Sequence, residues 1–372
     1  MRFFRIYPPA IPTACALAVL LFSCPDFLAG ASRSTTTETR LACSWEYDDN
    51  VFQESSGQMG SGAGLVSLFS RILFRYPATL TQFNCNIGYK DHYRLSEEET
   101  RRAGDILAYR LSLDSEKRFS ANWFAGTETE FKQRHVYRKS ELDLLSEEGY
   151  LRGSGKLYAR RNLHHKDALT FSYRYSFFDF DTFKSFNYGA HGPSLKYSRN
   201  LSPRLTGSVS YTLTRRGYKR EVFALDHQGS LVQLPIRQND NHHQFDFSVG
   251  YSGAFLANFI YSLQNNDSNS YGFSYWNNRF IILLAGKLPR DFFLNAYLFF
   301  EIKRYSDKVS EPILIDIITG ENDNNGAVIK LSKPLGPVWE GAATFSFYRN
   351  ESSIRDLNFR KSLINLGLTC RF

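Results

Sequence analysis

The chain ends in Leu363-Ile-Asn-Leu-Gly-Leu-Thr-Cys-Arg-Phe372, a stretch in which apolar and polar side chains alternate without a break up to a terminal aromatic residue. Successive residues of a β-strand point to opposite faces. The stretch therefore predicts a strand with one apolar and one polar face. The apolar face carries Ile364, Leu366, Leu368, Cys370 and Phe372, and the polar face carries Asn365, Gly367, Thr369 and Arg371. One strand of this kind fits a soluble β-sandwich as well as a transmembrane β-barrel, so the pattern of the other strands is needed to distinguish these two folds.

Several other segments repeat this alternation. They are Leu169–Phe177, Leu205–Thr214, Leu294–Ile302 and Trp339–Tyr348. In most of them, small hydroxyl residues lie opposite aliphatic and aromatic residues. Repetition of the pattern favours a barrel with lipid outside and water inside over a soluble sandwich.

The composition agrees with a membrane barrel. Aromatic residues make up 16% of the chain, and aromatic rings girdle transmembrane barrels at both membrane interfaces. The mean hydropathy of −0.36 is compatible with this fold, because only every second residue of a barrel strand faces lipid. After the N-terminal leader no apolar run reaches the length of a transmembrane helix, about eighteen residues, so none is expected.

The N-terminus resembles a secretory leader. A basic start and the apolar stretch Ala10–Ser23 precede Ala29-Gly-Ala31, which has the small residues of a leader cleavage site. We therefore assign residues 1–31 to a signal peptide. An alternative cut lies at Leu21-Phe-Ser-Cys24, which has the spacing of a lipoprotein cleavage box and would leave Cys24 lipidated, although Phe22 is bulky for that position.

Short turns and longer polar connections alternate along the chain. The expected turns lie at residues 76–79, 114–117, 164–167, 201–204, 252–254, 288–291 and 334–337, and the longer connections at roughly 54–63, 93–103, 133–147, 181–186, 218–240, 266–271, 305–322 and 351–359. Transmembrane barrels have short periplasmic turns and longer extracellular loops. The alternation predicts an all-β fold, a single antiparallel transmembrane barrel of about sixteen strands with both chain ends in the periplasm. If Leu65–Phe74 forms a short helix instead, fourteen strands remain.

One domain is expected, because no linker-like stretch interrupts the periodic segments. We predict a short periplasmic segment at residues 32–43 and a barrel over residues 44–372, with Ser44–Gln53 as its first strand. The connection at residues 218–240 contains two apolar runs around a turn-forming Asp226-His-Gln-Gly229. It predicts a hairpin that extends its flanking strands above the outer leaflet.

The polar faces of these strands would line the lumen. Their basic residues are Arg110, Arg152, Lys156, Arg160, Arg174, Lys196 and Lys330, and their acidic residues are Glu128, Glu130, Asp246, Glu301 and Glu340. A modest basic excess is consistent with the formal net charge of +8. Lys156 and its neighbours four residues away on either side form a cationic ladder on one strand, which would favour anionic solutes or acidic polymers. The alternative is that facing carboxylates pair with these cations.

Catalytic and metal-binding patterns are weak. Asp240, His242 and His243 lie near the expected outer rim, but no nucleophile accompanies them. We find no Cys/His metal spacing, no phosphate-binding glycine loop and no nucleophile elbow, so no cofactor and no enzyme activity are expected. Cys43 and Cys370 would lie on adjacent strands at barrel closure, and a disulfide between them is left open.

Three short phrases suggest a family. They are Trp45-Glu-Tyr-Asp-Asp-Asn-Val-Phe52, the stretch from Tyr261 through Asn265-Asn-Asp-Ser-Asn-Ser270 to Tyr275, and Tyr348-Arg-Asn-Glu-Ser-Ser353. Together with the terminal Phe372 they resemble bacterial outer-membrane β-barrel proteins found with exopolysaccharide export systems and as the barrel half of surface-lipoprotein assembly modifiers. The resemblance implies a Gram-negative outer-membrane location and a role in transport or export.

The leading hypothesis is an outer-membrane pore or export conduit for anionic solutes or an extracellular polysaccharide. The alternatives are a structural or interaction barrel with a blocked lumen that binds a partner through its loops, and an outer-membrane hydrolase. Expected partners are outer-membrane lipid, the barrel-insertion machinery and polysaccharide or secretion components; nucleic acid is not expected, because the chain is exported. The C-terminal Phe372 resembles the signal that the insertion machinery recognises.

Overall fold

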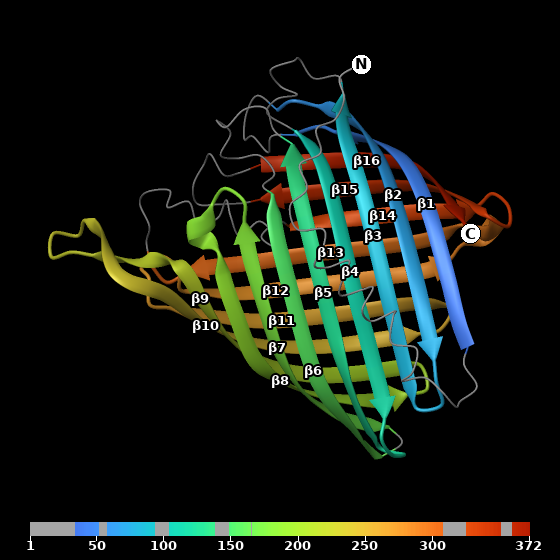
Figure 1. Ribbon diagram of the computed structural model, residues 1–372, viewed down its shortest axis with the longest axis horizontal. Coiled ribbons are helices and arrows are strands. Elements are labelled where there is room, and N and C mark those ends of the chain that lie inside the picture. Colours follow the sequence, from blue (N-terminus) through green and yellow to red (C-terminus); the bar gives the residue numbers. More distant parts are fainter. Residues whose placement is uncertain are drawn as a thin grey trace, which may run out of the picture.

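The computed structural model describes residues 34–51, 58–93, 104–137, 149–164, 166–307, 325–350 and 359–372. In this part of the chain sixteen antiparallel strands close into one barrel, because β1 pairs with β16 as well as with β2 (Figure 1). The strands are β1 (Ser34–Asp48), β2 (Ser61–Arg75), β3 (Thr79–Tyr93), β4 (Asp105–Arg118), β5 (Trp123–Tyr137), β6 (Tyr150–His164), β7 (Asp167–Phe180), β8 (Tyr188–Ser202), β9 (Leu205–Leu225), β10 (Leu231–Ser252), β11 (Phe255–Ser268), β12 (Tyr275–Lys287), β13 (Phe293–Tyr305), β14 (Asn325–Pro334), β15 (Trp339–Asn350) and β16 (Phe359–Arg371).

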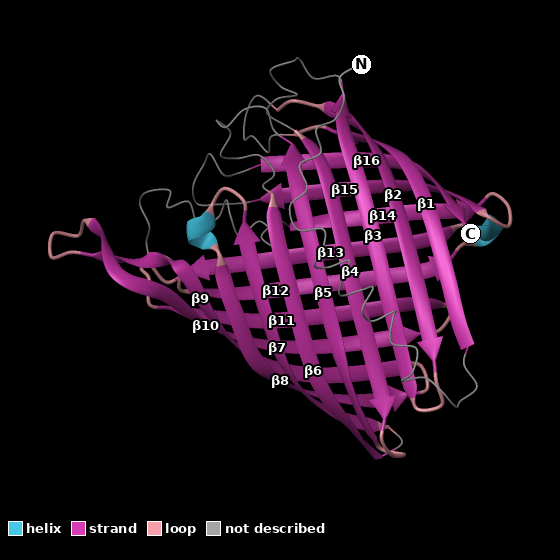
Figure 2. Cartoon of the chain, in the orientation of Figure 1, coloured by secondary structure: helices cyan, strands magenta, loops and turns pink. Residues whose placement is uncertain are grey.

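The all-β prediction with sixteen strands is confirmed. Leu65–Phe74 lies within β2 and not in a helix, which removes the fourteen-strand alternative. The only helical elements among the described residues are the 3-10 turns η2 (Lys184–Phe186) and η3 (Pro289–Asp291), shown in cyan in Figure 2. None of the described residues belongs to a helix with the length and hydropathy needed to cross a membrane.

The start of the first strand differs from the prediction. β1 begins at Ser34 and not at Ser44, and most of the expected periplasmic segment at residues 32–43 therefore belongs to the barrel. The run of Ser and Thr residues at 34–37 lacks an apolar alternation, yet each of these residues pairs with β2. β-Branched threonines favour extended backbone, and pairing with a long neighbour supplies the hydrogen bonds. The predicted leader, residues 1–31, lies outside the described residues.

The two faces of the strands differ as expected for a transmembrane barrel. Large apolar side chains project from the outer wall, as shown by Leu157, Phe171 and Leu366, which are 67%, 55% and 51% exposed. Monomeric soluble proteins rarely expose contiguous apolar patches of such extent. The outer wall is therefore a lipid-facing surface, and the alternate residues face inward.

The connections alternate between a turn end and a loop end of the barrel. Most predicted turns are confirmed, but Asp114–Lys117 lies inside β4, and the turn follows at Phe119, whose N–H donates to the carbonyl of Trp123 at 2.9 Å. The prediction failed because a strand segment with two carboxylates on its inner face, Asp114 and Glu116, has the composition of a turn.

The hairpin expected at residues 218–240 is confirmed. β9 and β10 are the longest strands, with 21 and 22 residues, and their ends extend beyond the other strands in Figure 1. The Asp226 carboxylate closes the turn by accepting hydrogen bonds from the N–H groups of Gln228 and Ser230, both at 2.8 Å. Gly229 supplies the positive φ of 78° that this turn requires.

One proline lies inside a strand. Pro193 of β8 has no N–H to donate, and the described pairing of β8 with β9 omits both Gly192 and Pro193. The backbone of β9 approaches Gly192 closely, because a Cβ atom at this position would lie 1.7 Å from the carbonyl oxygen of Leu213. Gly192 therefore permits the local irregularity that accommodates the proline.

Candidate functional site

The candidate site is the inner wall of the barrel. The strand register joins inward-facing residues into rows that run around the lumen. One row crosses β4 to β8 through Asp114, Glu128, Lys156, Arg174 and Gly192. All seven basic residues proposed for the lumen lie at inward-facing positions of their strands. Each is an even number of residues away from an inward-facing residue of the same strand, or is that residue itself.

Carboxylates neutralise several of these cations. The pairs are Lys156–Glu128 at 2.9 Å, Arg160–Glu116 at 2.9 Å, Lys330–Glu340 at 3.7 Å, and Arg110 with Glu130. The cationic ladder on β6 is therefore largely compensated by acids on β4 and β5. Glu116 is absent from the predicted lumen residues, because its charged neighbourhood has the composition of a turn. Glu116 lies two residues after Asp114 on β4, and this spacing places both carboxylates on the inner face.

Two basic residues lack this compensation. Arg174 and Lys196 are exposed on the inner wall, and within the described residues no carboxylate lies within 4.0 Å of either side chain. The register explains their exposure. Arg174 has Gly192 as its neighbour on β8, which carries no side chain, and Lys196 lies between Thr170 and Ser210, which carry no charge. Both cations therefore point into the lumen. Arg152, in contrast, is half-buried and has other interactions.

Two acidic residues on the other side of the barrel accept hydrogen bonds from neutral donors. The Asp246 carboxylate on β10 accepts hydrogen bonds from Ser210 at 3.2 Å, Gln244 at 2.8 Å and Ser262 at 2.5 Å. Glu301 on β13 accepts one from the Asn277 amide. Hydrogen bonds of this kind stabilise an ionised carboxylate without adding positive charge. Among the seven proposed lumen cations, the two exposed ones without a carboxylate partner in the described part of the chain thus lie on β7 and β8.

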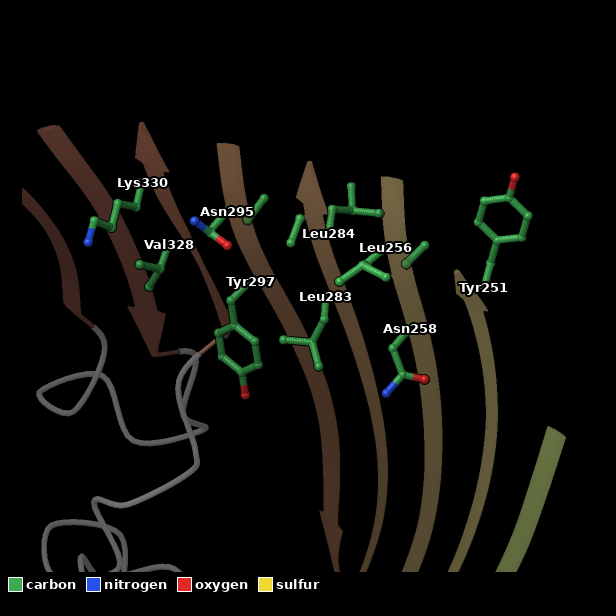
Figure 3. Close-up of a pocket in the computed structure, with 12 residues that line it drawn as sticks. Tyr251, Leu256, Asn258, Leu283, Leu284, Asn295, Tyr297, Val328 and Lys330 are labelled. Atoms are coloured by element: carbon green, nitrogen blue, oxygen red, sulfur yellow. The ribbon is translucent and has the colours of Figure 1, made fainter. Parts of the chain in front are cut away.

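An apolar hollow of about 480 Å³ lies on the inner wall near the turn end of β11 to β14. Figure 3 shows Leu283, Tyr297 and Val328 of its lining, with Asn258 and Lys330 at its sides. Leu283 is 38% exposed although it faces inward, so open space adjoins the wall here. The hollow was not predicted from the sequence, because the turn-end half of β12 is apolar on both faces and lacks an alternating pattern.

A buried polar network lies on the inner side of the β9–β10 extension, at the loop end. Gln238 accepts a hydrogen bond from the Arg220 guanidinium at 2.6 Å and donates one to Asp240 at 2.9 Å. The Arg220 guanidinium also lies over the Phe273 ring, 3.9 Å from its centroid. Since the apolar outer face of β9 ends at Leu213, Arg220 lies beyond the membrane. Burial lowers the pKa of its guanidinium to about 10, which leaves it charged at neutral pH.

The three proposed acid–base residues do not all share one face of β10. Asp240 is 2% exposed, and its carboxylate is held by Gln238, by Ser268 at 2.6 Å and by Asn266 at 3.1 Å. His242 faces inward and is buried, whereas His243 faces outward and lies 2.8 Å from the Tyr211 hydroxyl. The two imidazoles therefore lie on opposite faces of β10, and only His242 shares the inner face with Asp240.

No group of three or more His, Cys, Asp or Glu side chains among the described residues has the arrangement of a metal site. Cys43 and Cys370 are free thiols. Both lie on the outer face near the seam, but their register partners are Leu368 and Leu41. The two cysteines are thus diagonal neighbours and not directly opposed residues.

The chain matches no protein-family model and no curated protein sequence. Solved structures similar to it include a bacterial polysaccharide outer membrane secretin, with 10% identity over 90% of this chain and 98% of that chain and a TM-score of 0.42. OmpT, an outer membrane protein of Vibrio cholerae, has 10% identity over 92% and 100% of the two chains and a TM-score of 0.43. The toluene transporter TodX of Pseudomonas putida has 8% identity over 90% and 89% and a TM-score of 0.39. These likenesses are too distant to assign a function.

The location follows from the fold itself. A closed barrel of sixteen antiparallel strands, with an apolar outer wall and a polar inner wall, is the structure that crosses the bacterial outer membrane without leaving unpaired backbone groups in lipid. The chain is an outer-membrane β-barrel protein.

Proposed function

We propose that the barrel is an outer-membrane pore or conduit whose lumen favours anionic solutes. The observation that carries this proposal is the exposure of Arg174 and Lys196 on the inner wall without a carboxylate partner among the described residues. Cations that line an aqueous passage raise the local concentration of anions and lower that of cations. Ion-paired residues such as Lys156 contribute much less to this field, because a neighbouring carboxylate cancels most of their charge.

An acidic extracellular polysaccharide belongs to the same substrate class, since it presents repeated carboxylates or phosphates to the wall. The hollow lined by Leu283, Tyr297 and Val328 adds an apolar surface near the turn end of the same passage. A chain of sugar rings has apolar faces that can contact such side chains while its acidic groups meet Arg174 and Lys196. We therefore include export of an acidic polysaccharide in the proposal.

Conductance of the purified protein in planar lipid bilayers tests the proposal. Discrete open-state steps are expected, and the reversal potential in a KCl gradient should show a preference for chloride. The double variant Arg174→Glu/Lys196→Glu should shift this preference toward potassium. The matched control is the exchange Glu128→Lys/Lys156→Glu, which keeps the pair and the net charge and should leave the selectivity close to that of the unchanged protein.

Two results would contradict the proposal. Absence of conductance steps from correctly folded protein would favour the alternative of a structural barrel with a blocked lumen. An unchanged reversal potential in the Arg174→Glu/Lys196→Glu variant would show that these residues do not set selectivity. Block of the current by added polyuronate fragments, and not by neutral dextran of similar length, is expected if acidic polysaccharides enter the passage.

A further inference from the structure

A hollow of about 510 Å³ opens on the outer wall of the barrel, over β7 to β10. Its floor is formed by Gly189 and Gly217, which are direct register partners on β8 and β9 and face outward. Their missing side chains leave the space that a residue pair would normally fill. The side chains around the hollow come from β7, β9 and β10 and include Tyr175, Phe177, Asp179, Lys219, Arg237 and Asn239.

The hollow lies where the lipid-facing band ends. On β9 the outward residues Val209, Tyr211 and Leu213 are apolar, and the next outward residues toward the loop end are Arg215, Gly217 and Lys219. On β7, Tyr175 and Phe177 provide the rings that occupy the membrane–water interface of such barrels. The loop end of a transmembrane barrel faces the exterior. The hollow is therefore at the level of the headgroups of the outer leaflet.

The charges around the hollow are mainly positive. Lys219 lies 3.4 Å from Asp179, and both side chains remain largely exposed, at 63% and 44%. Arg215 and Arg237 are exposed as well, and no carboxylate of the described residues lies within 4.0 Å of either guanidinium. Although Glu221 is the register partner of Arg237, the two side chains form no ion pair in the described part of the chain. The Arg237 guanidinium thus lines the open hollow, and Arg215 lies two residues before Gly217 on the same outward face of β9.

We propose that this hollow binds the phosphorylated headgroup of an outer-leaflet glycolipid. Guanidinium groups bind phosphate oxygens in a bidentate manner, and basic clusters at the membrane surface attract anionic lipid headgroups. The rings of Tyr175 and Phe177 provide apolar surface for the sugar and for the start of the acyl chains. The site opens toward the bilayer and not toward the lumen, so a lipid fits its position better than a transported solute does.

The basic residues at the turn end of the outer wall provide a contrast. Arg161 lies over the Trp123 ring, 5.3 Å from its centroid, and Arg199 lies 3.6 Å from the Asp167 carboxylate. These two arginines face the other leaflet and already have partners. They are therefore the matched control for charge at the outer wall.

Two variants test the site in independent ways. Gly189→Leu fills the hollow without removing charge, and it should fold, because a Cβ atom there meets only the Tyr175 hydroxyl at 3.8 Å. Arg215→Glu/Arg237→Glu reverses the charge and keeps the hollow. Arg161→Glu/Arg199→Glu is the control, and the gel mobility of unheated samples verifies that each variant is folded.

The measurement is binding of diphosphoryl lipid A to the purified full-length protein in detergent, followed by native mass spectrometry. The unchanged protein and the control should retain this lipid in the presence of excess inorganic phosphate. Arg215→Glu/Arg237→Glu should bind it at least about tenfold more weakly, as expected when a charge-assisted contact is lost. Gly189→Leu should weaken binding to a similar extent, because its side chain fills the space of the headgroup. Dephosphorylated lipid A should bind weakly to all four proteins.

Three results would overturn the proposal. Equal retention of dephosphorylated lipid A would show that phosphate is not recognised, and displacement by inorganic phosphate would point to a simple anion site. An equal loss in the Arg161→Glu/Arg199→Glu control would show that the overall charge of the outer wall, and not the hollow, attracts the lipid.

Discussion

Removal of the Lys361 amine tests how the barrel is closed at its outer end. Lys361 Nζ lies 2.7 Å from Asp48 Oδ2 across the seam between β16 and β1, and the two side chains are only 10% and 4% exposed. Asp48 also accepts a hydrogen bond from the Asn50 N–H at 2.9 Å. A buried ion pair that loses one partner leaves an uncompensated charge, which costs about 3–5 kcal/mol. We therefore expect Lys361→Met to raise the unfolding equilibrium constant by roughly two to three and a half orders of magnitude.

The assay is unfolding by guanidinium chloride from lipid vesicles, followed by tryptophan fluorescence. Lys287→Met is the matched control, because Lys287 and Asp291 also lie 2.7 Å apart but are 61% and 68% exposed; this variant should unfold close to the midpoint of the unchanged protein. The double variant Asp48→Asn/Lys361→Met removes both charges and should recover part of the loss. If Lys361→Met and Lys287→Met have the same midpoint, the seam pair does not stabilise the closed barrel.

Two further predictions concern chain closure and backbone approach. Deletion of Phe372 removes two backbone hydrogen bonds to Thr39, at 2.8 and 3.4 Å, together with the C-terminal ring proposed as an assembly signal. The amount of heat-modifiable barrel in outer membranes should therefore fall. Normal assembly of the deletion variant would show that Phe372 is needed neither for closing the barrel nor as an assembly signal. Gly192→Ala should strongly reduce the yield of folded barrel, because its Cβ atom would overlap the Leu213 carbonyl. Gly155→Ala is the control and should fold normally, because no atom lies within 4 Å of its Cβ position. An equal loss of folded barrel in both variants would show that the clash at Gly192 is not the cause.

The sequence predicted most of what depends on the period of a strand. The inward positions of Lys156, Arg174 and Lys196 follow from alternation alone, because successive strand residues point to opposite faces. The strand number followed from the regular sequence of turns and loops. These features are encoded locally, within about ten residues, and a single sequence is sufficient to find them.

The partners of the lumen residues depend on the register between strands, which alternation does not give. Arg160 and Glu116 lie 44 residues apart in the chain and meet only because β6, β5 and β4 are staggered by a fixed amount. Strand ends were missed for a related reason. Asp114 and Glu116 are charged and Ser34 begins a run of hydroxyl residues, so both ends resemble loops in composition while their backbones remain paired.

Gly192 connects the fold of β8 with the charge of the lumen. Because it has no side chain, β9 can approach closely beside Pro193, and for the same reason the neighbouring Arg174 on β7 has no cross-strand partner that covers it. Lys156, the other neighbour of Arg174, is paired with Glu128 and leaves no carboxylate for it. Gly192, which permits the close approach of β9 beside Pro193, thus also leaves the Arg174 guanidinium exposed. The anion preference proposed for the lumen would therefore depend on this local irregularity as well as on the net charge of the chain.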